Sequence, residues 1–168
     1  CNSNKVEQTK KTPQELIKAG LIDEAKKEFM MPSDINSFDE DGNTVLHLAA
    51  MLDDEDLVTF LIIKGANTEL KNYNRDTPLL VAIKNNAPRA AAVLSQVGGD
   101  LFARDAQGIT ALDLGLSTNQ IYYDKFITTR TGEIRDTNGQ SIVHYFVKTK
   151  NLQAIQACIT KKLNISVP

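Results

Sequence analysis

Gly42-Asn43-Thr44-Val45-Leu46-His47-Leu48-Ala49-Ala50 is the stretch that decides the fold, because altered copies of it return at regular intervals along the chain. The threonine of this stretch, Thr44, is followed by Thr77, Thr110 and Ser141, so the successive spacings are 33, 33 and 31 residues. A period in this range is typical of stacked supersecondary units that bury their apolar faces against one another. Such stacks present surfaces rather than deep pockets, so recognition of a partner is the first functional hypothesis.

Every copy is built to the same plan. Turn-forming residues come first, at 39–42, 72–75, 105–108 and 136–139. Glycine and asparagine tolerate a positive φ, and Asp and Asn side chains bond their own backbone, so these segments are predicted turns. A threonine or serine follows as a helix N-cap, and short first helices are expected at 44–51 and 77–84. Second helices are expected at 53–64, 88–97, 120–128 and 151–162.

A further helix pair is predicted upstream, at 12–20 and 21–30. It begins with Thr12-Pro13, a cap followed by a proline at the first helical position. No turn segment precedes this pair, and it is rich in lysine and glutamate. These features favour an N-terminal cap whose outer face is polar.

The combination of turn, Gly-x-Thr-x-Leu-His-x-Ala-Ala, second helix and Gly65-Ala66-Asn67 closure resembles the ankyrin repeat. The resemblance covers residues 12–168 and implies an all-α solenoid of helix-turn-helix units with β-turn fingertips. It divides this region into a capping pair at 12–38 and repeats at 39–71, 72–104, 105–135 and 136–168. The fourth repeat either caps the stack or is followed by further repeats.

The copies depart from the ankyrin pattern at four places. Arg75 replaces the turn glycine of the second repeat, and Leu80 replaces its histidine. Asp113 replaces the histidine of the third repeat, whose second half is two residues short. We expect these departures to change local geometry and to leave the architecture intact.

The chain begins with Cys1, followed by a polar stretch without apolar periodicity, and residues 1–11 are predicted to form a flexible tether. A cysteine followed by a polar tether resembles the mature start of a bacterial lipoprotein. That resemblance implies lipidation of Cys1 and a location in the bacterial cell envelope, with the domain in the periplasm or at the surface. The alternative is that the sequence starts at an arbitrary boundary.

Composition excludes several classes of function. The chain carries 19 basic and 21 acidic residues, a net charge of −2, which gives no electrostatic case for nucleic-acid binding. No run approaches the roughly 18 apolar residues of a membrane-spanning helix. The two cysteines lie at opposite ends of the chain, so no disulfide framework or cysteine metal site is expected, and Cys158 is predicted to be buried.

Candidate catalytic and metal-binding residues have simpler structural interpretations. The ankyrin resemblance implies that His47 and His144 bond the caps Thr44 and Ser141, and the two histidines lie three repeats apart. The acidic runs at 39–41 and 53–56 suit helix starts and lack the ligand spacing of a calcium loop. No phosphate-binding loop, nucleophile elbow or His-Glu-x-x-His motif is present. We therefore expect no enzyme activity, no cofactor and no metal.

What remains is surface, because in ankyrin stacks the turn tips and the exposed side of the first helices form a concave face. Tyr73 and Arg75 are of the types enriched in binding hot spots, and Ile109 is apolar at an exposed tip. The alternative is that the tips are merely solvated and that Tyr73 lies on the neighbouring repeat. The predicted partner-binding residues are Glu40, Asp41, Asn43, Met51, Tyr73, Asn74, Arg75, Lys84, Gln107 and Ile109.

The sequence thus predicts a monomeric, non-enzymatic module that binds a protein partner through this concave face. Only lipid on Cys1 would attach it to a membrane, and neither nucleic acid nor a small-molecule substrate is expected. The alternative function is a structural or protective accessory in a stable complex with an envelope protein or enzyme.

Overall fold

The computed structural model describes residues 10–30, 34–118, 121–127, 133, 135–136 and 138–163. Within these residues the chain forms ten short α-helices, and the only extended pairings are two isolated bridges, Arg104 with Thr110 and Arg135 with Ser141. The prediction of an all-α helical stack is confirmed. Cys1 and the predicted tether up to residue 9 lie outside the described residues.

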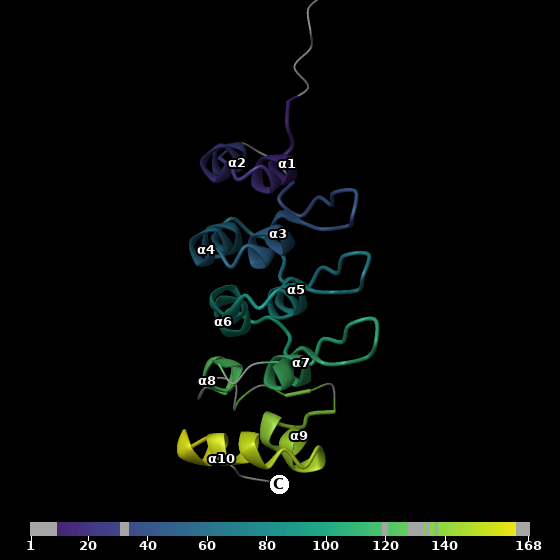
Figure 1. Ribbon diagram of the computed structural model, residues 1–168, viewed down its shortest axis with the longest axis vertical. Coiled ribbons are helices and arrows are strands. Elements are labelled where there is room, and N and C mark those ends of the chain that lie inside the picture. The colour runs from purple at the N-terminus through teal and green to yellow at the C-terminus, as the bar shows by residue number, and fades with distance from the viewer. Residues whose placement is uncertain are drawn as a thin grey trace, which may run out of the picture.

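The helices form five successive pairs, stacked one on another (Figure 1). Loops project to one side of the stack, next to the first helices α3, α5 and α7, and the second helices form a column on the opposite side. The axes of the last pair are turned relative to those of the earlier pairs. The pairs are α1 (Pro13–Lys18) with α2 (Ile22–Glu28), α3 (Val45–Met51) with α4 (Glu55–Ile63), α5 (Pro78–Lys84) with α6 (Pro88–Gln96), α7 (Ala111–Thr118) with α8 (Ile121–Phe126), and α9 (Ile142–Lys148) with α10 (Leu152–Thr160).

Helix starts fall where the predicted caps lie. Thr12 forms a capping box at α1: its hydroxyl accepts from the Glu15 N–H at 3.2 Å, and the Glu15 carboxylate accepts from the Thr12 N–H at 2.7 Å. The Thr77 hydroxyl accepts from the backbone of α5, and the Asp54 carboxylate accepts from the Leu57 N–H at 2.9 Å in α4. These local bonds explain why such short helices begin at fixed residues.

One continuous apolar core runs along the stack between the two columns of helices, from Leu16 in α1 to Leu163 after α10. Fully buried alanines such as Ala49 and Ala82 on the first helices let neighbouring repeats approach closely. Cys158 is also buried there, as predicted. The stack therefore has the shared core that holds the projecting loops at fixed spacing.

The third repeat adapts to its shortened second half. The helix predicted at 120–128 is observed as α8 over residues 121–126, six residues against nine in α4 and α6, while residues 120 and 128 lie outside the described part. Gly115 in α7 leaves room for the buried ring of Phe126, since an added Cβ would lie 2.4 Å from that ring. A smaller residue on one helix thus accommodates a larger one on its partner.

Candidate protein-binding face

Each projecting loop is fixed by an Asp or Asn side chain at its base. We call the loops 39–43, 72–76, 105–109 and 136–140 the tip loops. Asp39 Oδ1 accepts from the backbone N–H groups of Asp41 at 3.0 Å and Asn43 at 2.8 Å. Asn72, Asp105 and Asp136 each accept the two equivalent bonds in their own loops. The loop conformation therefore depends mainly on the residue at its base.

The backbone at each tip also has a positive φ, at Gly42, Arg75, Gly108 and Gly139. Glycine adopts this left-handed conformation readily, whereas for other L-residues it is strained. Arg75, with a φ of 63°, is the exception among these four positions. The predicted local change at Arg75 is therefore absent: the turn is kept, and the strain is borne by an arginine.

His47 is a structural residue. It is fully buried, its Nδ1 accepts from the Thr44 N–H at 3.1 Å, and its Nε2 lies 3.0 Å from the carbonyl oxygen of Asp76. Since Nδ1 accepts, Nε2 carries the proton and donates to Asp76, which ties the first repeat to the second tip loop. Burial lowers the pKa of His47, so the ring stays neutral.

His144 repeats the cap contact, with Nδ1 2.8 Å from the Ser141 hydroxyl, as predicted. At the third repeat, Asp113 takes over from histidine. It accepts from the Thr110 hydroxyl at 2.9 Å and from the hydroxyl of Tyr145 in α9. The bond between neighbouring repeats is therefore retained although the residue type has changed.

A lysine on the first helix of two pairs reaches forward to the tip loops. Lys18 Nζ lies 2.9 Å from Asp39 and 3.4 Å from Asp41, and Lys84 Nζ lies 2.7 Å from Asp76 and 3.3 Å from Asp105. Ion pairs that are this close and partly buried hold both the loop and the lysine stem in place.

The position halfway between these two lysines carries Met51, 33 residues from each. The loop position that corresponds to Asp39 and Asp105 carries Asn72 instead of an aspartate, and Asn72 Nδ2 donates to Asn43 Oδ1 at 2.9 Å. A neutral pair thus stands where the neighbouring levels of the stack have a charged pair.

The charges at the loop bases are consistent with these contacts. Burial raises the pKa of Asp105, but the backbone N–H of Ile109 and the ammonium of Lys84 outweigh it, and the net pKa is lowered. The same balance lowers the pKa of Asp39, where Lys18 supplies the cation. Burial lowers the pKa of Lys84, yet its two carboxylates raise it overall. Both loop-base carboxylates are therefore ionised at neutral pH.

Most predicted partner-binding residues are exposed at the tips. Tyr73 is 75% exposed, and its ring also lies on the first tip loop, because a Cβ added at Gly42 would lie 2.5 Å from it. The ring of Tyr73 thus lies on the neighbouring repeat, as the alternative to partner binding held, yet most of its surface is exposed. The side chain of Arg75 makes no hydrogen bond or ion pair with any described residue. Glu40, Asn74, Gln107 and Ile109 are likewise exposed.

Two of the predicted residues serve the stack itself. Asn43 is 7% exposed and its side chain accepts from Asn72, so its expected place at an exposed tip is wrong. Lys84 is held by two carboxylates, as described above, and reaches the surface only in part. The bond between Asn43 and Asn72, and the ion pair of Lys84 with Asp105, join neighbouring repeats, and a single repeat's pattern does not contain them.

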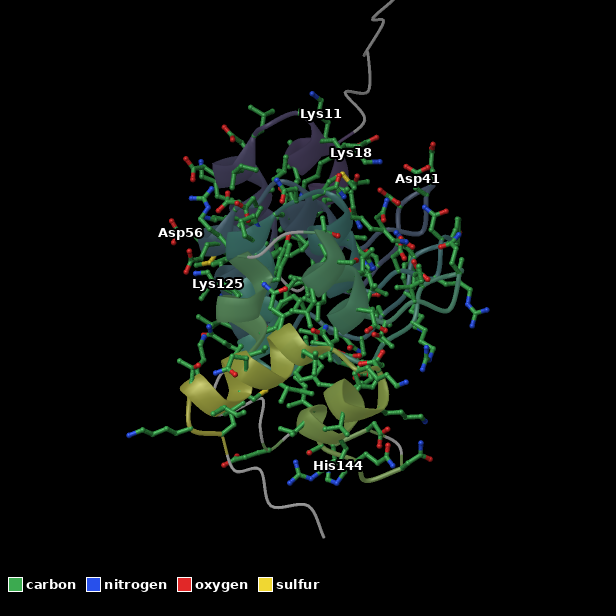
Figure 2. All side chains as sticks on the ribbon, turned by 60° about the horizontal axis from the view of Figure 1, so that its bottom comes forward. Lys11, Lys18, Asp41, Asp56, Lys125 and His144 are labelled. Atoms are coloured by element: carbon green, nitrogen blue, oxygen red, sulfur yellow. The ribbon has the colours of Figure 1, made fainter. Side chains whose placement is uncertain are left out.

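Sequence reasoning missed the contribution of the capping pair. Ile17 and Lys18 of α1 join Leu48, Met51 and Leu52 of the next repeat around a hollow of about 220 Å³. A larger, more polar hollow of about 650 Å³ adjoins it between α1 and the first tip loop. Figure 2 labels Lys18 and Asp41 at this end of the stack. One signal was available: Lys18 precedes Met51 by one full period.

Comparison with known proteins agrees with this architecture. The family described as ankyrin repeats (3 copies) matches residues 15–105 and again residues 46–130, more than half of the chain. The chain belongs to the ankyrin-repeat family. Ankyrin repeats generally mediate protein–protein interaction.

Similar proteins are much longer than this chain. Rabankyrin-5 of Mus musculus is 28% identical over 130 residues, 75% of this chain and 11% of that protein. Inversin of Canis lupus familiaris is 26% identical over 127 residues, 73% of this chain and 12% of that protein. The poly [ADP-ribose] polymerase tankyrase of Caenorhabditis elegans is 36% identical over 70 residues, 42% of this chain and 3% of that protein. The shared part is therefore the repeats.

Two further kinds of feature are absent from the part of the chain that the structure describes. No helix there is both long and apolar enough to cross a bilayer. Across the same residues, no three or more His, Cys, Asp or Glu side chains gather in a way that would hold a metal ion. The face of tip loops and first helices is the feature that stands out.

Proposed function

We propose that this ankyrin-repeat protein is a non-enzymatic, monomeric module that binds a protein partner through its tip-loop face. We define this face as the tip loops together with the exposed side of α1, α3, α5, α7 and α9. The observation that carries the proposal is the second tip loop, where a largely exposed Tyr73 stands beside an exposed Arg75 whose side chain bonds no described residue.

The backbone conformation of Arg75 costs folding free energy, and no bond from its side chain to a described residue offsets that cost. The left-handed conformation costs an L-residue roughly 1–2 kcal/mol, and glycine stands at the three equivalent tips. Strained residues that persist without a structural partner are concentrated at functional sites. An arginine held there presents its whole guanidinium to a partner's carboxylate or carbonyl groups.

Tyr73 supports the same interpretation. Its ring is seated on Gly42, which limits its freedom, while its exposed face and hydroxyl are available for contact. Large, pre-positioned aromatic groups contribute much binding energy at low entropic cost. Because the loop bases fix the backbone by paired hydrogen bonds, little ordering is needed when a partner binds.

The proposed surface comprises the exposed predicted residues, with Lys84 at its edge and Asn43 as support beneath it. A partner that crosses several tip loops meets carboxylates at the first loop and Arg75 at the second, so mixed charge would orient it. The exposed members are Glu40, Asp41, Met51, Tyr73, Asn74, Arg75, Gln107 and Ile109.

Absence of catalysis is part of this proposal. The buried His47 is neutral and fully engaged, and His144 bonds its own cap. The match to tankyrase covers 3% of that enzyme, so its activity does not carry over. Lipidation of Cys1 and an envelope location stay predictions from the sequence, to be tested by intact-mass measurement of the protein from its own cells.

Affinity capture tests the proposal. The full chain and a Tyr73→Ala/Arg75→Ala variant are immobilised side by side and exposed to extract of the cells that express the protein. We expect at least one protein retained by the wild type and lost by the variant, with unchanged circular dichroism. Equal capture by both would place binding elsewhere and reject the role of the second tip loop.

A further inference from the structure

A small apolar hollow opens on the tip-loop face between α1 and α3. Its walls are the side chains of Ile17, Lys18, Leu48, Met51 and Leu52, and its volume is about 220 Å³. Sites for drug-sized molecules are larger, about 300–1,000 Å³. The hollow is therefore matched to a single bulky side chain, and we call it the notch.

The notch exists because of Met51. At the levels before and after it, Lys18 and Lys84 extend over the face to reach their loop carboxylates. Met51 carries no charge, Asn72 replaces the aspartate, and 42% of the methionine stays exposed beside a Leu52 that is 53% exposed. Methionine is flexible and polarizable, so it adapts to different apolar partners.

The first tip loop, which Lys18 links to the notch, carries excess negative charge. Asp39, Glu40 and Asp41 follow one another in the first tip loop, and Lys18 is the cation that pairs with two of them. The Asp41 side chain is 72% exposed, and the exposed Glu40 has no ion pair with any described residue. The adjoining larger hollow adds Glu15 on its wall.

A ligand that fits both features must be apolar at one point and positively charged close by. An apolar side chain alone would leave Glu40 without an ion pair to any described residue, and a cation alone would leave Met51 and Leu52 in water. Lys18 lines both the notch and the larger hollow, so the two hollows are adjacent. The apolar group and the positive charge must therefore lie close together in the ligand.

We infer that this end of the tip-loop face binds a segment of a protein partner in which a bulky apolar side chain lies next to a lysine or arginine. The apolar side chain enters the notch, and the cation meets Glu40 and Asp41. This inference rests on the proposed function and adds the chemistry of the bound segment.

The test begins with a random-peptide display library panned against the full chain. We expect enriched peptides to share a bulky apolar residue next to a lysine or arginine. Enrichment of acidic peptides, of peptides without an apolar residue, or of none would overturn the inference, because a preformed notch should select its ligand.

Variants then locate the binding of a synthetic enriched peptide by fluorescence anisotropy. Met51→Lys, which copies the neighbouring levels, and Leu52→Gln are each expected to weaken Kd about tenfold or more, a loss of about 1.4 kcal/mol. Ile63→Lys, an exposed residue on the far column in α4, is the matched control and should leave Kd unchanged. Glu40→Gln/Asp41→Asn should weaken binding mainly at low salt.

The Tyr73→Ala/Arg75→Ala variant separates the two proposals. If it loses a captured partner while Met51→Lys and Leu52→Gln keep that partner and the peptide, the proposed function stands and the notch inference fails. If Met51→Lys and Leu52→Gln lose the peptide, the inference is supported. If no variant changes either binding, both are rejected.

Discussion

Arg75→Gly should make the protein more stable and a poorer binder at once. Relief of the left-handed strain contributes roughly 1–2 kcal/mol. Glycine has more conformational freedom in the unfolded chain, and this cancels about 0.5–1 kcal/mol of the gain in stability. Because no described residue bonds the Arg75 side chain, its removal costs the fold nothing more. The net gain is about 0.5–1 kcal/mol.

Equilibrium urea unfolding of the full chain measures this gain. With a urea dependence of about 1–3 kcal/mol per molar, the midpoint should rise by a few tenths of a molar. Affinity for a captured partner should fall about tenfold, since an arginine contact is lost. Stability and binding therefore move in opposite directions, which a purely structural arginine would not produce.

Gly108→Ala is the matched control at the equivalent tip of the third repeat. Its φ is 79°, and an added Cβ meets nothing within 4 Å, so the substitution isolates the backbone term. It should destabilise the chain by about 1 kcal/mol. Gly108→Ala should lower the urea midpoint. If Arg75→Gly lowers the midpoint as well, or leaves it unchanged, then Arg75 does not destabilise its loop, and the strain argument is refuted.

Three further predictions concern the stack. Burial lowers the pKa of His47 in the folded state, so as the pH falls the imidazole is protonated first in the unfolded chain, near about pH 6.5, and the urea midpoint should decline below that pH. His47→Leu should remove this part of the pH dependence, and an unchanged dependence would contradict the buried, neutral state assigned to His47. Gly115→Ala should cost about 1–3 kcal/mol by pushing on Phe126, and a thermal midpoint equal to the wild type would show that the ring moves aside freely. Lys84→Met alone should lower the free energy of unfolding by about 1–2 kcal/mol, and adding Asp105→Asn should restore part of that loss. If the losses of the two substitutions simply add, Lys84 and Asp105 are not energetically coupled.

The parts of the fold that sequence reasoning predicted are those set by local chemistry. Thr12 and Thr77 cap the helices they precede, and His47 bonds Thr44 three residues away. These contacts lie within one repeat, so spacing along the chain is enough to find them. The repeat boundaries built on that spacing stay predictions.

The parts that sequence reasoning missed depend on how repeats meet. Asn43 is buried where Asn72 of the next loop donates to it, and Lys84, which pairs with Asp76 of its own loop, also reaches Asp105 of the next loop. The notch needs Ile17 of the capping pair to lie beside Met51. Position in a repeat predicts which residues point toward the tip-loop face, but whether each stays free depends on the residue one period away.

Photo-crosslinking in the cells that express the protein tests the central claim most directly. A photoreactive amino acid is placed at Arg75 in one variant and at Ile63, exposed on the opposite column, in another. We predict a discrete crosslinked partner from position 75 and none from position 63. A partner crosslinked from position 63 and absent from position 75 would contradict binding through the tip-loop face.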